Sequence, residues 1–330
     1  MVLIIQSIRD VIETPMTFKR IIYGYLQLNY ILRVTRKDKY EIGYYKNASK
    51  IGFHFENGAT NKIWQSKVYK DKYYFPKTIT TTADDDIILS FFSAKPTNKR
   101  IIYKPATDYG GYGIRLYDDI KEYKEKKPKV KGILQYEVEP MLFKDKFKFD
   151  MRSHLLFVKD SFSKTYSVYH LHTADWVKIC NKKFQKKGSK LGGFLTNVCA
   201  NNYVENNIQC FQSFMKNNFK NYNELLEKYE KVLKDIATER LYQLKKNNVS
   251  KCPNQVWIAG TDIMFDKYGN ARFLEINGRP GILEHDDSPN AYFGCGQCAK
   301  DVCELGIHYW MKNKPSQFEK SSSVRLIASI

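Results

Sequence analysis

Several features that would assign this chain to a familiar class of protein are scarce in its sequence. Only seven of its 330 residues are cysteine. An odd number scattered along a long chain is typical of reduced thiols rather than of a disulfide framework. No apolar run approaches the length of a transmembrane helix. The first residues, MVLIIQSIRDVIETP, have no basic segment before their short apolar patch. We therefore expect no signal peptide, no membrane association and a cytoplasmic location.

Internal repeats and low-complexity segments are also missing, and acidic residues are few relative to basic ones. With 43% hydrophobic residues, the 330-residue chain can bury a sizeable core divided over two or three subdomains. Lys and Arg number 54 against 35 Asp and Glu, a formal net charge of +19. This excess favours an acidic partner, either nucleic acid or an acidic protein surface, and does not distinguish between them.

Strand and helix patterns are mixed without strict alternation, which predicts the α+β (mixed α/β) class. Residues 1–80 are β-rich with short polar turns, and we expect them to form a small N-terminal mixed domain. A central segment, residues 81–150, carries a glycine loop. The C-terminal segment is expected to span residues 151–330.

Three helices are expected within the two larger segments. One lies near residues 83–93, with Thr82 as its N-cap and acids in its first turn. A long one covers about residues 205–246, because apolar residues recur there three and four apart, and a last one lies near 297–313. The expected strands are 100–104, 133–138, 150–158, 256–265 and 271–277.

The stretch RFLEINGRPG combines an apolar strand pattern with two oxygen-bearing side chains. In an extended strand Phe273, Glu275 and Asn277 share one face. Leu274 and Ile276 then share the other face. An edge strand with a solvated polar face would have the same pattern, so the pair needs further support.

The preceding strand supplies that support through Asp262. If residues 267–270, KYGN, form a four-residue loop in which Asp266 pairs with Ala271, then Asp262 lies opposite Glu275. A loop of three or five residues would place it on the other face. Two carboxylates about 5 Å apart repel unless a cation joins them. A magnesium site at this patch is the alternative to a solvated face, since Mg²⁺ prefers oxygen ligands.

Bound magnesium usually shares its ligands with substrate phosphates, so groups that bind phosphate are expected near it. YKPATDYGGYGI offers Lys104 at a strand end, followed by Gly110, Gly111 and Gly113. Glycines let backbone N–H groups approach phosphate oxygens, and the lysine supplies a charge. An ordinary glycine hairpin is the alternative.

The stretch KFKFDMRSHLLFV alternates charged and apolar residues. Lys148, Asp150 and Arg152 share one face of a strand, with Phe149 and Met151 on the other. Such a face can form the polar floor of a site, or a surface ladder of weak salt bridges.

Seven motifs occur in order between about residues 75 and 290: FPKT, YKP…GGYGI, LQYEVEP, KFDMR, FLTN, GTDIMFD and FLEINGRPG. Their order resembles the tubulin–tyrosine ligase-like family of ATP-grasp ligases. The resemblance implies an ATP-grasp fold in which two α+β halves hold ATP and Mg²⁺. It further implies that ATP phosphorylates a carboxylate and that the amine of an amino acid attacks the acyl phosphate. The implied partners are a free amino acid and an acidic protein acceptor such as a tubulin tail, modified by a glutamylase or tyrosine-ligase type of reaction.

The same resemblance assigns roles by position. Lys104 and Arg152 would be catalytic, with Arg152 facing the γ-phosphate and the acyl phosphate. Gln135 and the backbone near Val138 would hold the adenine. The full ATP-binding set is Lys104, Gly111, Gly113, Gln135, Val138, Lys148, Asp150 and Asn197, and the magnesium ligands are Asp262, Glu275 and Asn277.

Two departures from the family pattern leave other interpretations open. His172 stands in LHTAD where an arginine is usual, and Phe194 precedes LTN where a histidine is usual. An inactive relative therefore stays possible. The adenine-side stretch is also shifted by one residue, so either Gln135 or Tyr136 can take the expected place. A ligase for a small peptide or metabolite and a basic nucleic-acid-binding protein, the latter because of the charge and the 24 tyrosines, are further alternatives. We expect a monomer.

Two further features are set aside or left open. Cys295, Cys298, Cys303 and His308 have spacings similar to a zinc site, but on a helix five-residue steps rotate about 140°, so idle thiols are expected. The basic stretch NKKFQKKGSK is either a solvated loop or a collector of acidic peptide, through Lys182, Lys183, Lys186 and Lys187.

Overall fold

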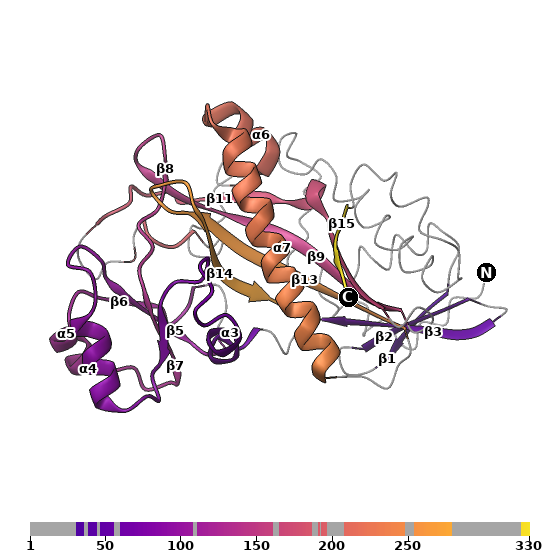
Figure 1. The fold of residues 1–330 in the computed structure, drawn as a ribbon, viewed down its shortest axis with the longest axis horizontal. Helices are drawn as coiled ribbons and strands as arrows, with labels where there is room; N and C mark the ends of the chain where they lie inside the picture. The colour runs from indigo at the N-terminus through magenta and orange to yellow at the C-terminus, as the bar shows by residue number, and fades with distance from the viewer. Residues whose placement is uncertain are drawn as a thin grey trace.

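The computed structural model shows two β-sheets with helices packed on them (Figure 1). This mixture of helices and largely antiparallel strands confirms the expected α+β class. No helix in the described part of the chain is long and apolar enough to cross a bilayer. The structure describes residues 31–35, 39–44, 47–55, 60–107, 111–160, 165–186, 191, 193–196, 208–247, 254–278 and 325–330.

The larger sheet has the strand order β1-β2-β3-β13-β9-β10-β15 within the described residues. Strand β14 pairs with β13, and β8 and β11 pair with β9, while β12 pairs with β11. All pairs are antiparallel except β3 with β13. The bounds are β1 Ile31–Thr35, β2 Lys39–Tyr44, β3 Asn47–Phe55, β8 Leu142–Phe143, β9 Phe147–Asp160, β10 Thr165–His170, β11 Trp176–Ile179, β12 Ile208–Cys210, β13 Asn254–Phe265, β14 Ala271–Asn277 and β15 Arg325–Ser329.

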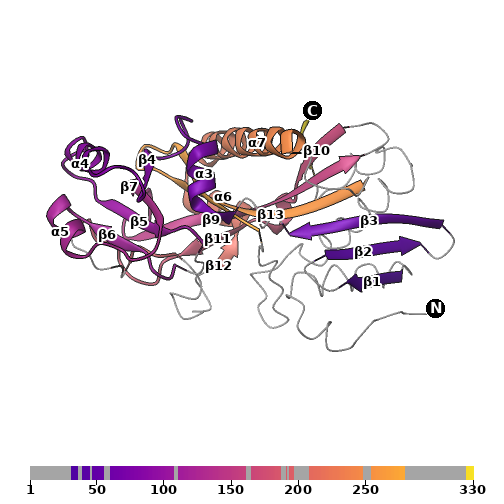
Figure 2. The same ribbon diagram turned by 90° about the horizontal axis from the view of Figure 1, so that it is seen from below.

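The smaller sheet has the order β4-β7-β5-β6. Helices α4 and α5 cover one of its faces, where Phe91 and Tyr123 pack with Tyr103 and Leu134. Seen from below, this sheet and its helices lie at one end of the molecule and β1–β3 at the other (Figure 2). The bounds are β4 Thr78–Thr80, α4 Asp85–Ser93, β5 Ile101–Pro105, β6 Arg115–Tyr117, α5 Ile120–Glu125 and β7 Gly132–Tyr136.

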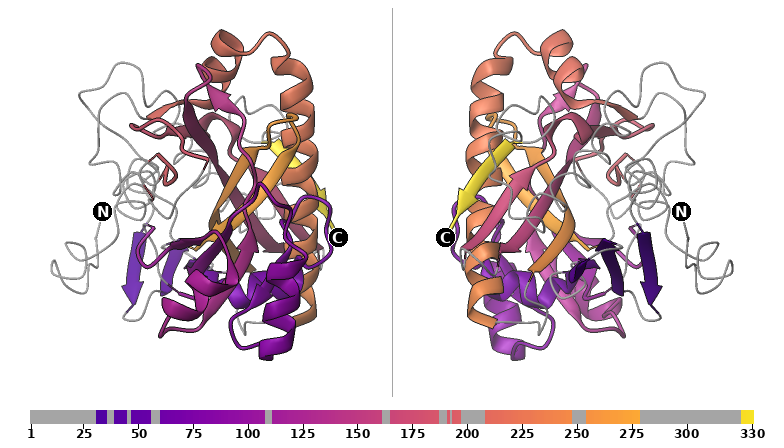
Figure 3. Two further views of the ribbon diagram at one scale, coloured as in Figure 1. Left: turned by 90° about the vertical axis from the view of Figure 1, so that its left-hand side faces the viewer. Right: turned by 90° about the vertical axis from the view of Figure 1, so that its right-hand side faces the viewer.

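The main core lies between the large sheet and α7 (Tyr222–Asn247). Figure 3 shows this helix along one flank of the sheet. Phe149 and Met151 of β9 point into this core, as the alternation of the strand predicts. The opposite face of β9 is thereby left for Lys148 and Asp150.

The single long helix expected over residues 205–246 is wrong. Helix α6 (Phe211–Asn218) and α7 are separate, and Phe219 between them has an extended backbone. Its ring packs against Phe149 at 5.5 Å and Phe214 at 5.8 Å between centroids. Tertiary packing of this aromatic side chain therefore overrides the helical periodicity.

The helix expected near residues 83–93 is confirmed, but its start is not. Asp84 is the N-cap of α4, and Asp85 and Asp86 lie in the first turn. Thr82 instead shares a side-chain hydrogen bond with Thr80 at 3.0 Å. The helix expected near 297–313 lies outside the described residues.

All five expected strands are present, as β5, β7, β9, β13 and β14. Sheet membership does not follow the expected domain boundaries strictly. Strand β4 precedes residue 81 yet pairs with β7, and β9 runs across residue 150. The division at 80 and 150 stays a prediction, since pairing alone does not define domains. Cys180 and Cys210 form no disulfide with one another.

Candidate active site

Asp262 and Glu275 lie opposite each other, as predicted, but the connection between their strands is different. Phe265, not Asp266, pairs with Ala271, so the loop has five residues, 266–270. A five-residue loop would by itself turn Asp262 away from Glu275. The expected four-residue loop is therefore wrong, and another feature must restore the pairing.

That feature is a β-bulge at Leu274. Ile263 pairs with Phe273, while the preceding residue of β13, Asp262, pairs with Glu275, so Leu274 has no partner. Leu274 and Glu275 both line a pocket, whereas Phe273 and Ile276 are buried in the core beneath α7. The prediction that Phe273 shares the face of Glu275 is thus wrong, because the bulge shifts the alternation by one residue.

The five-residue loop is held by its own side chains. The carboxylate of Asp266 accepts hydrogen bonds from the backbone N–H groups of Tyr268 at 3.0 Å and Asn270 at 2.9 Å. Gly269 adopts φ +77°, which favours glycine. The hydrogen bonds from the backbone of Tyr268 and Asn270 to Asp266 therefore set the loop at five residues. The bulge at Leu274 then restores the pairing of Asp262 with Glu275.

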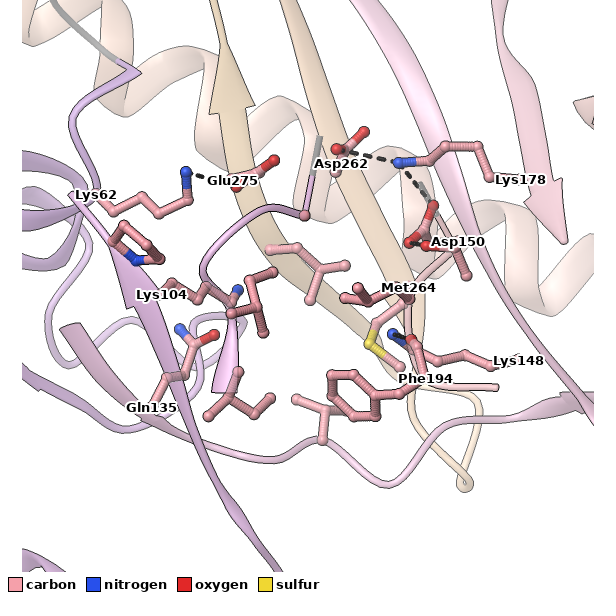
Figure 4. A pocket seen from close by; sticks show the side chains of 18 of the residues that line it. Lys62, Lys104, Gln135, Lys148, Asp150, Lys178, Phe194, Asp262, Met264 and Glu275 are labelled. Atoms are coloured by element: carbon pink, nitrogen blue, oxygen red, sulfur yellow. Dashed lines mark hydrogen bonds and ion pairs between the residues drawn. The ribbon is translucent and has the colours of Figure 1, made fainter. Parts of the chain in front are cut away.

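The pocket, hereafter the cleft, lies between the two sheets and has about 780 Å³ of empty space including its open mouth. Figure 4 shows Lys62, Lys104 and Gln135 on one side and Lys178 and Asp150 on the other. Eight of the residues predicted from the sequence line it: Lys104, Gly111, Gln135, Val138, Lys148, Asp150, Asp262 and Glu275.

The remaining predicted residues fall into three groups. Arg152 and Asn277 do not line the cleft but bond to residues that do. Gly113 is not part of the lining. Asn197 lies outside the described residues, as do Lys187, the three cysteines near the C-terminus and His308.

The carboxylate of Asp262 is held by two cations. Arg152 Nε is 2.6 Å from Oδ1 and Nη2 is 3.0 Å from Oδ2, a two-pronged contact. Lys178 Nζ is 3.1 Å from Oδ2. Burial opposes ionisation, but Arg152 and Lys178 together hold the pKa of Asp262 well below its usual range. Asp262 is therefore an anion at neutral pH.

Lys178 was not predicted from the sequence. It lies on β11 opposite Asp150, and its Nζ is 2.8 Å from Asp150 Oδ1 as well as close to Asp262. Burial disfavours its charge, but the two carboxylates raise its pKa above the ordinary value. The available signal was a single lysine in the buried apolar strand WVKI.

Lys62 was also missed, because no local pattern marks it. It is the first residue of α3 (Lys62–Val68), and its Nζ is 3.2 Å from Glu275 Oε2. Gln65 of the same helix fixes the contact, since its amide bonds to both the N–H and the carbonyl of Ile276. Burial opposes the charge of Glu275, but Lys62 and other lysines lower its pKa.

Asn277 completes the patch of oxygen-bearing side chains. Its Nδ2 is 3.1 Å from Asp262 Oδ2 and 3.3 Å from Glu275 Oε1. A half-turn of the amide would present its oxygen instead. Within the described residues, no three Asp, Glu, His or Cys side chains are arranged so that all three could hold one metal ion. Two carboxylates and an amide nonetheless fit Mg²⁺, which keeps waters or phosphate oxygens as its other ligands.

Two buried lysines of the cleft have no carboxylate within 4 Å among the described residues. Burial lowers the pKa of Lys104 to about 8, partly offset by Glu275. Burial also lowers the pKa of Lys148, whose Nζ donates to the carbonyl of Phe194 at 2.8 Å and lies 4.4 Å from the centre of its ring. Phe194, at the position where histidine was expected, thus packs on a lysine.

The ionic groups of the cleft do not cancel. Among the described residues, four lysines of the lining and Arg152, which lies just behind it, face three carboxylates, which leaves an excess of two positive charges in a largely buried space. Such an excess is costly unless an anionic ligand neutralises it. The cations are Lys62, Lys104, Lys148, Lys178 and Arg152, and the carboxylates are Asp150, Asp262 and Glu275.

The other end of the cleft is apolar. Ile102 of β5 lines it together with Met264 and Leu274 from the large sheet. Figure 4 shows the Phe194 ring beside Met264 at this end. Gln135 is buried among them and its Nε2 donates to Thr78 Oγ1 at 2.9 Å. This end suits a flat heteroaromatic ring with a polar edge.

The glycine loop closes one side of the cleft. Gly111 adopts φ +84° and Gly113 φ +70°, conformations that favour glycine. Gly111 lines the cleft, so its backbone can approach a ligand closely. Gly110 lies outside the described residues.

His172 lies away from the cleft lining, in a short 3₁₀ turn over His172–Ala174. Burial lowers its pKa, and the nearby His170 ring lowers it further.

Asp175 accepts hydrogen bonds from the Tyr229 hydroxyl and, at 3.2 Å, from the N–H of His154. This buried network supports β9 and β11 just beyond Arg152.

Fold and site together define an α+β protein with a buried cationic cleft suited to a polyanion and a hard cation. A comparison with family models matches the tubulin-tyrosine ligase family over residues 38–317. Because the match covers well over half of the chain, the protein belongs to this family, and ATP-dependent ligase activity is implied at that general level. A search of curated proteins found no match.

Proposed function

We propose that this protein is an ATP-grasp ligase that activates a carboxylate with ATP and joins an amino acid to an acidic protein acceptor. The observation that carries the proposal is the placement of Asp262, Glu275 and Asn277 across the cleft from Lys104. A carboxylate patch facing a lysine provides for a metal ion and for phosphate in one space.

Each part of ATP has candidate partners in the cleft. The apolar end around Ile102 and Met264 takes the adenine, with Gln135 and the backbone at Val138 at its polar edge. Lys104, Lys148 and the backbone of the glycine loop hold the phosphates. The phosphates would then neutralise the excess positive charge of the cleft.

The patch of Asp262, Glu275 and Asn277 would hold Mg²⁺, which neutralises charge on phosphate oxygens during transfer. In the ligand-free protein Lys62 and Lys178 satisfy these carboxylates. When phosphates enter, the two lysines acquire additional anionic partners. The lysines therefore keep the carboxylates ionised and ordered before the ligand arrives.

We assign Arg152 to the transferred phosphoryl group, which it would reach from just behind the cleft lining. Asp262 fixes two nitrogens of its guanidinium, and the Trp176 ring centre lies 5.7 Å from its Cζ. A guanidinium held in this way can stabilise the negative charge of the acyl phosphate while the amine attacks. The attack forms the amide bond and releases inorganic phosphate, with the amine proton passing to solvent or phosphate.

The chemistry is tested by mass spectrometry of tubulin incubated with the protein, ATP, Mg²⁺ and a mixture of amino acids. We expect a mass increase of one or more amino-acid residues on an acidic tail, dependent on ATP. ATP consumption without any modified tubulin would favour a small peptide or metabolite as acceptor. Absence of ATP binding would contradict the proposal.

A further inference from the structure

A second cavity lies next to the cleft and has about 1200 Å³ of empty space including its open mouth. Phe194 lines the cleft, whereas Phe184 and Arg100 line the second cavity. The Arg100 Cζ lies 5.8 Å from the ring centre of Phe184 and 5.3 Å from that of Phe194. These three side chains form a wall, so the second cavity is a separate space. We name it the lysine groove, after Lys95, Lys99, Lys186 and Lys267 in its lining.

The lysines of the groove are only partly neutralised. Glu139 contacts both Lys186 at 3.2 Å and Lys267 at 2.6 Å. Lys95 donates to the carbonyl of Lys99, and no described carboxylate lies within 4 Å of either ammonium. The buried Arg100–Glu137 pair is neutral as a unit. Four lysines against Glu139 and Asp118 leave two positive charges.

The lining distinguishes between polyanions. Phe184 is the one aromatic side chain in it, and its ring packs against Phe194 and Arg100. The described lining of the groove therefore forms no stacking platform for single-stranded nucleic acid. Asp118 and Glu139 would repel a phosphate backbone. A polypeptide carries spaced carboxylates for the lysines and N–H donors for these two acids.

We propose that the lysine groove docks an acidic segment of a polypeptide, separately from the nucleotide in the cleft. Docking itself requires no ATP. Only the further step, that the segment belongs to the acceptor of the ligation reaction, rests on the proposed function.

The test is fluorescence anisotropy with a labelled glutamate-rich peptide and the full chain, at low salt and without ATP. The variant Lys95→Ala/Lys99→Ala removes the two lysines without a carboxylate partner, and we expect roughly fivefold weaker binding. The matched control is Lys121→Ala/Lys124→Ala, which removes the same charge from exposed positions of α5 outside both cavities. The control should bind as the wild type does, and Lys95→Arg/Lys99→Arg should retain binding.

Calorimetric ATP titration of the same variants separates this proposal from the proposed function. We expect unchanged ATP affinity in Lys95→Ala/Lys99→Ala, which also shows that the variant is folded. If the wild type binds no ATP, the proposed ligase function is contradicted, whereas the result on peptide docking still holds. If peptide binding is weakened equally in the variant and the control, or if the wild type binds no peptide, the proposed docking in the lysine groove is contradicted. A labelled single-stranded DNA that binds more tightly and depends on the same lysines would overturn it in favour of nucleic acid.

Discussion

Two buried ionic clusters on either side of Phe194 differ in how their charges balance. Arg100 and Glu137 form a closed pair, with contacts of 2.9 Å and 2.6 Å between side chains and 3.1 Å from the backbone N–H of Arg100. Within the described residues, the cleft and Arg152 behind its lining together have five cations and three carboxylates. A balanced pair is complete without a ligand, whereas an excess of buried charge is not. Excess charge therefore indicates a binding site more clearly than burial or charge alone.

The largest expected effect comes from Glu275→Gln in the unbalanced cluster. We expect turnover to fall about a hundredfold or more, because the metal patch loses one charge while the side-chain volume is kept. The fold should persist, since the amide oxygen can still accept from Lys62. Steady-state kinetics at saturating Mg²⁺ measure this. Asp262→Asn should have a similar effect that does not add to the first; normal turnover in Glu275→Gln would remove the metal assignment.

In the balanced Arg100–Glu137 pair, we expect Glu137→Gln to reduce folding stability and to leave ATP binding nearly unchanged. Leaving Arg100 buried without its anion costs about 3–5 kcal/mol of folding free energy. Urea unfolding measures this loss, and ATP affinity of the folded variant should change little. A variant with wild-type stability and lost ATP binding would contradict the comparison, since the pair would then serve the cleft.

Lys104→Ala should weaken ATP binding about tenfold to a hundredfold, the worth of a charge-assisted hydrogen bond. Stability should change little or rise, because a buried cation without a carboxylate partner is removed. Calorimetric titration provides the affinity, with Lys121→Ala as the control for a lost surface charge. Wild-type affinity would mean that the glycine loop is only a turn.

Lys104 also predicts a pH dependence. Its pKa of about 8 in the folded protein lies below the ordinary 10.5, so between these values the unfolded chain holds more protons. Stability of the ligand-free protein should therefore rise across this interval, while ATP affinity falls as pH passes 8. Comparing wild type with Lys104→Met isolates the contribution of this lysine. Identical slopes in the two proteins would contradict the assignment.

The smallest effect is expected from neutralising Lys182, Lys183, Lys186 and Lys187 together. Steering by surface charge should help an acidic acceptor to bind, so its KM should rise roughly two- to threefold. The value of kcat should stay constant, because ground state and transition state are bound alike. ATP affinity should also stay constant; a fall of equal size would place this loop at the nucleotide.

Most of the cleft could be predicted because strand alternation is local information. Lys148 and Asp150 face the cleft and Phe149 the core, as a period of two requires. The predicted pairing of Asp262 with Glu275 is confirmed, but the four-residue loop from which it was inferred is wrong. The loop is one residue longer than expected, and the bulge at Leu274, which depends on packing, offsets it.

The missed residues depend on long-range contacts. Lys62 reaches Glu275 only because Gln65 docks α3 on the backbone of Ile276, more than 200 residues away in sequence. Lys178 becomes part of the site only because β11 pairs with β9. Neither contact leaves a strong local pattern, and Phe219 breaks a helix for the same reason.

We propose that a metal–ATP complex supplies the negative charge that balances the excess of cations in the cleft. The most direct test is calorimetric titration of ATP into the full chain at pH 7, with and without Mg²⁺. We expect one site, tighter binding with Mg²⁺, and loss of that Mg²⁺-dependent gain in Glu275→Gln. Absence of binding, or a gain from Mg²⁺ that survives Glu275→Gln unchanged, would contradict it.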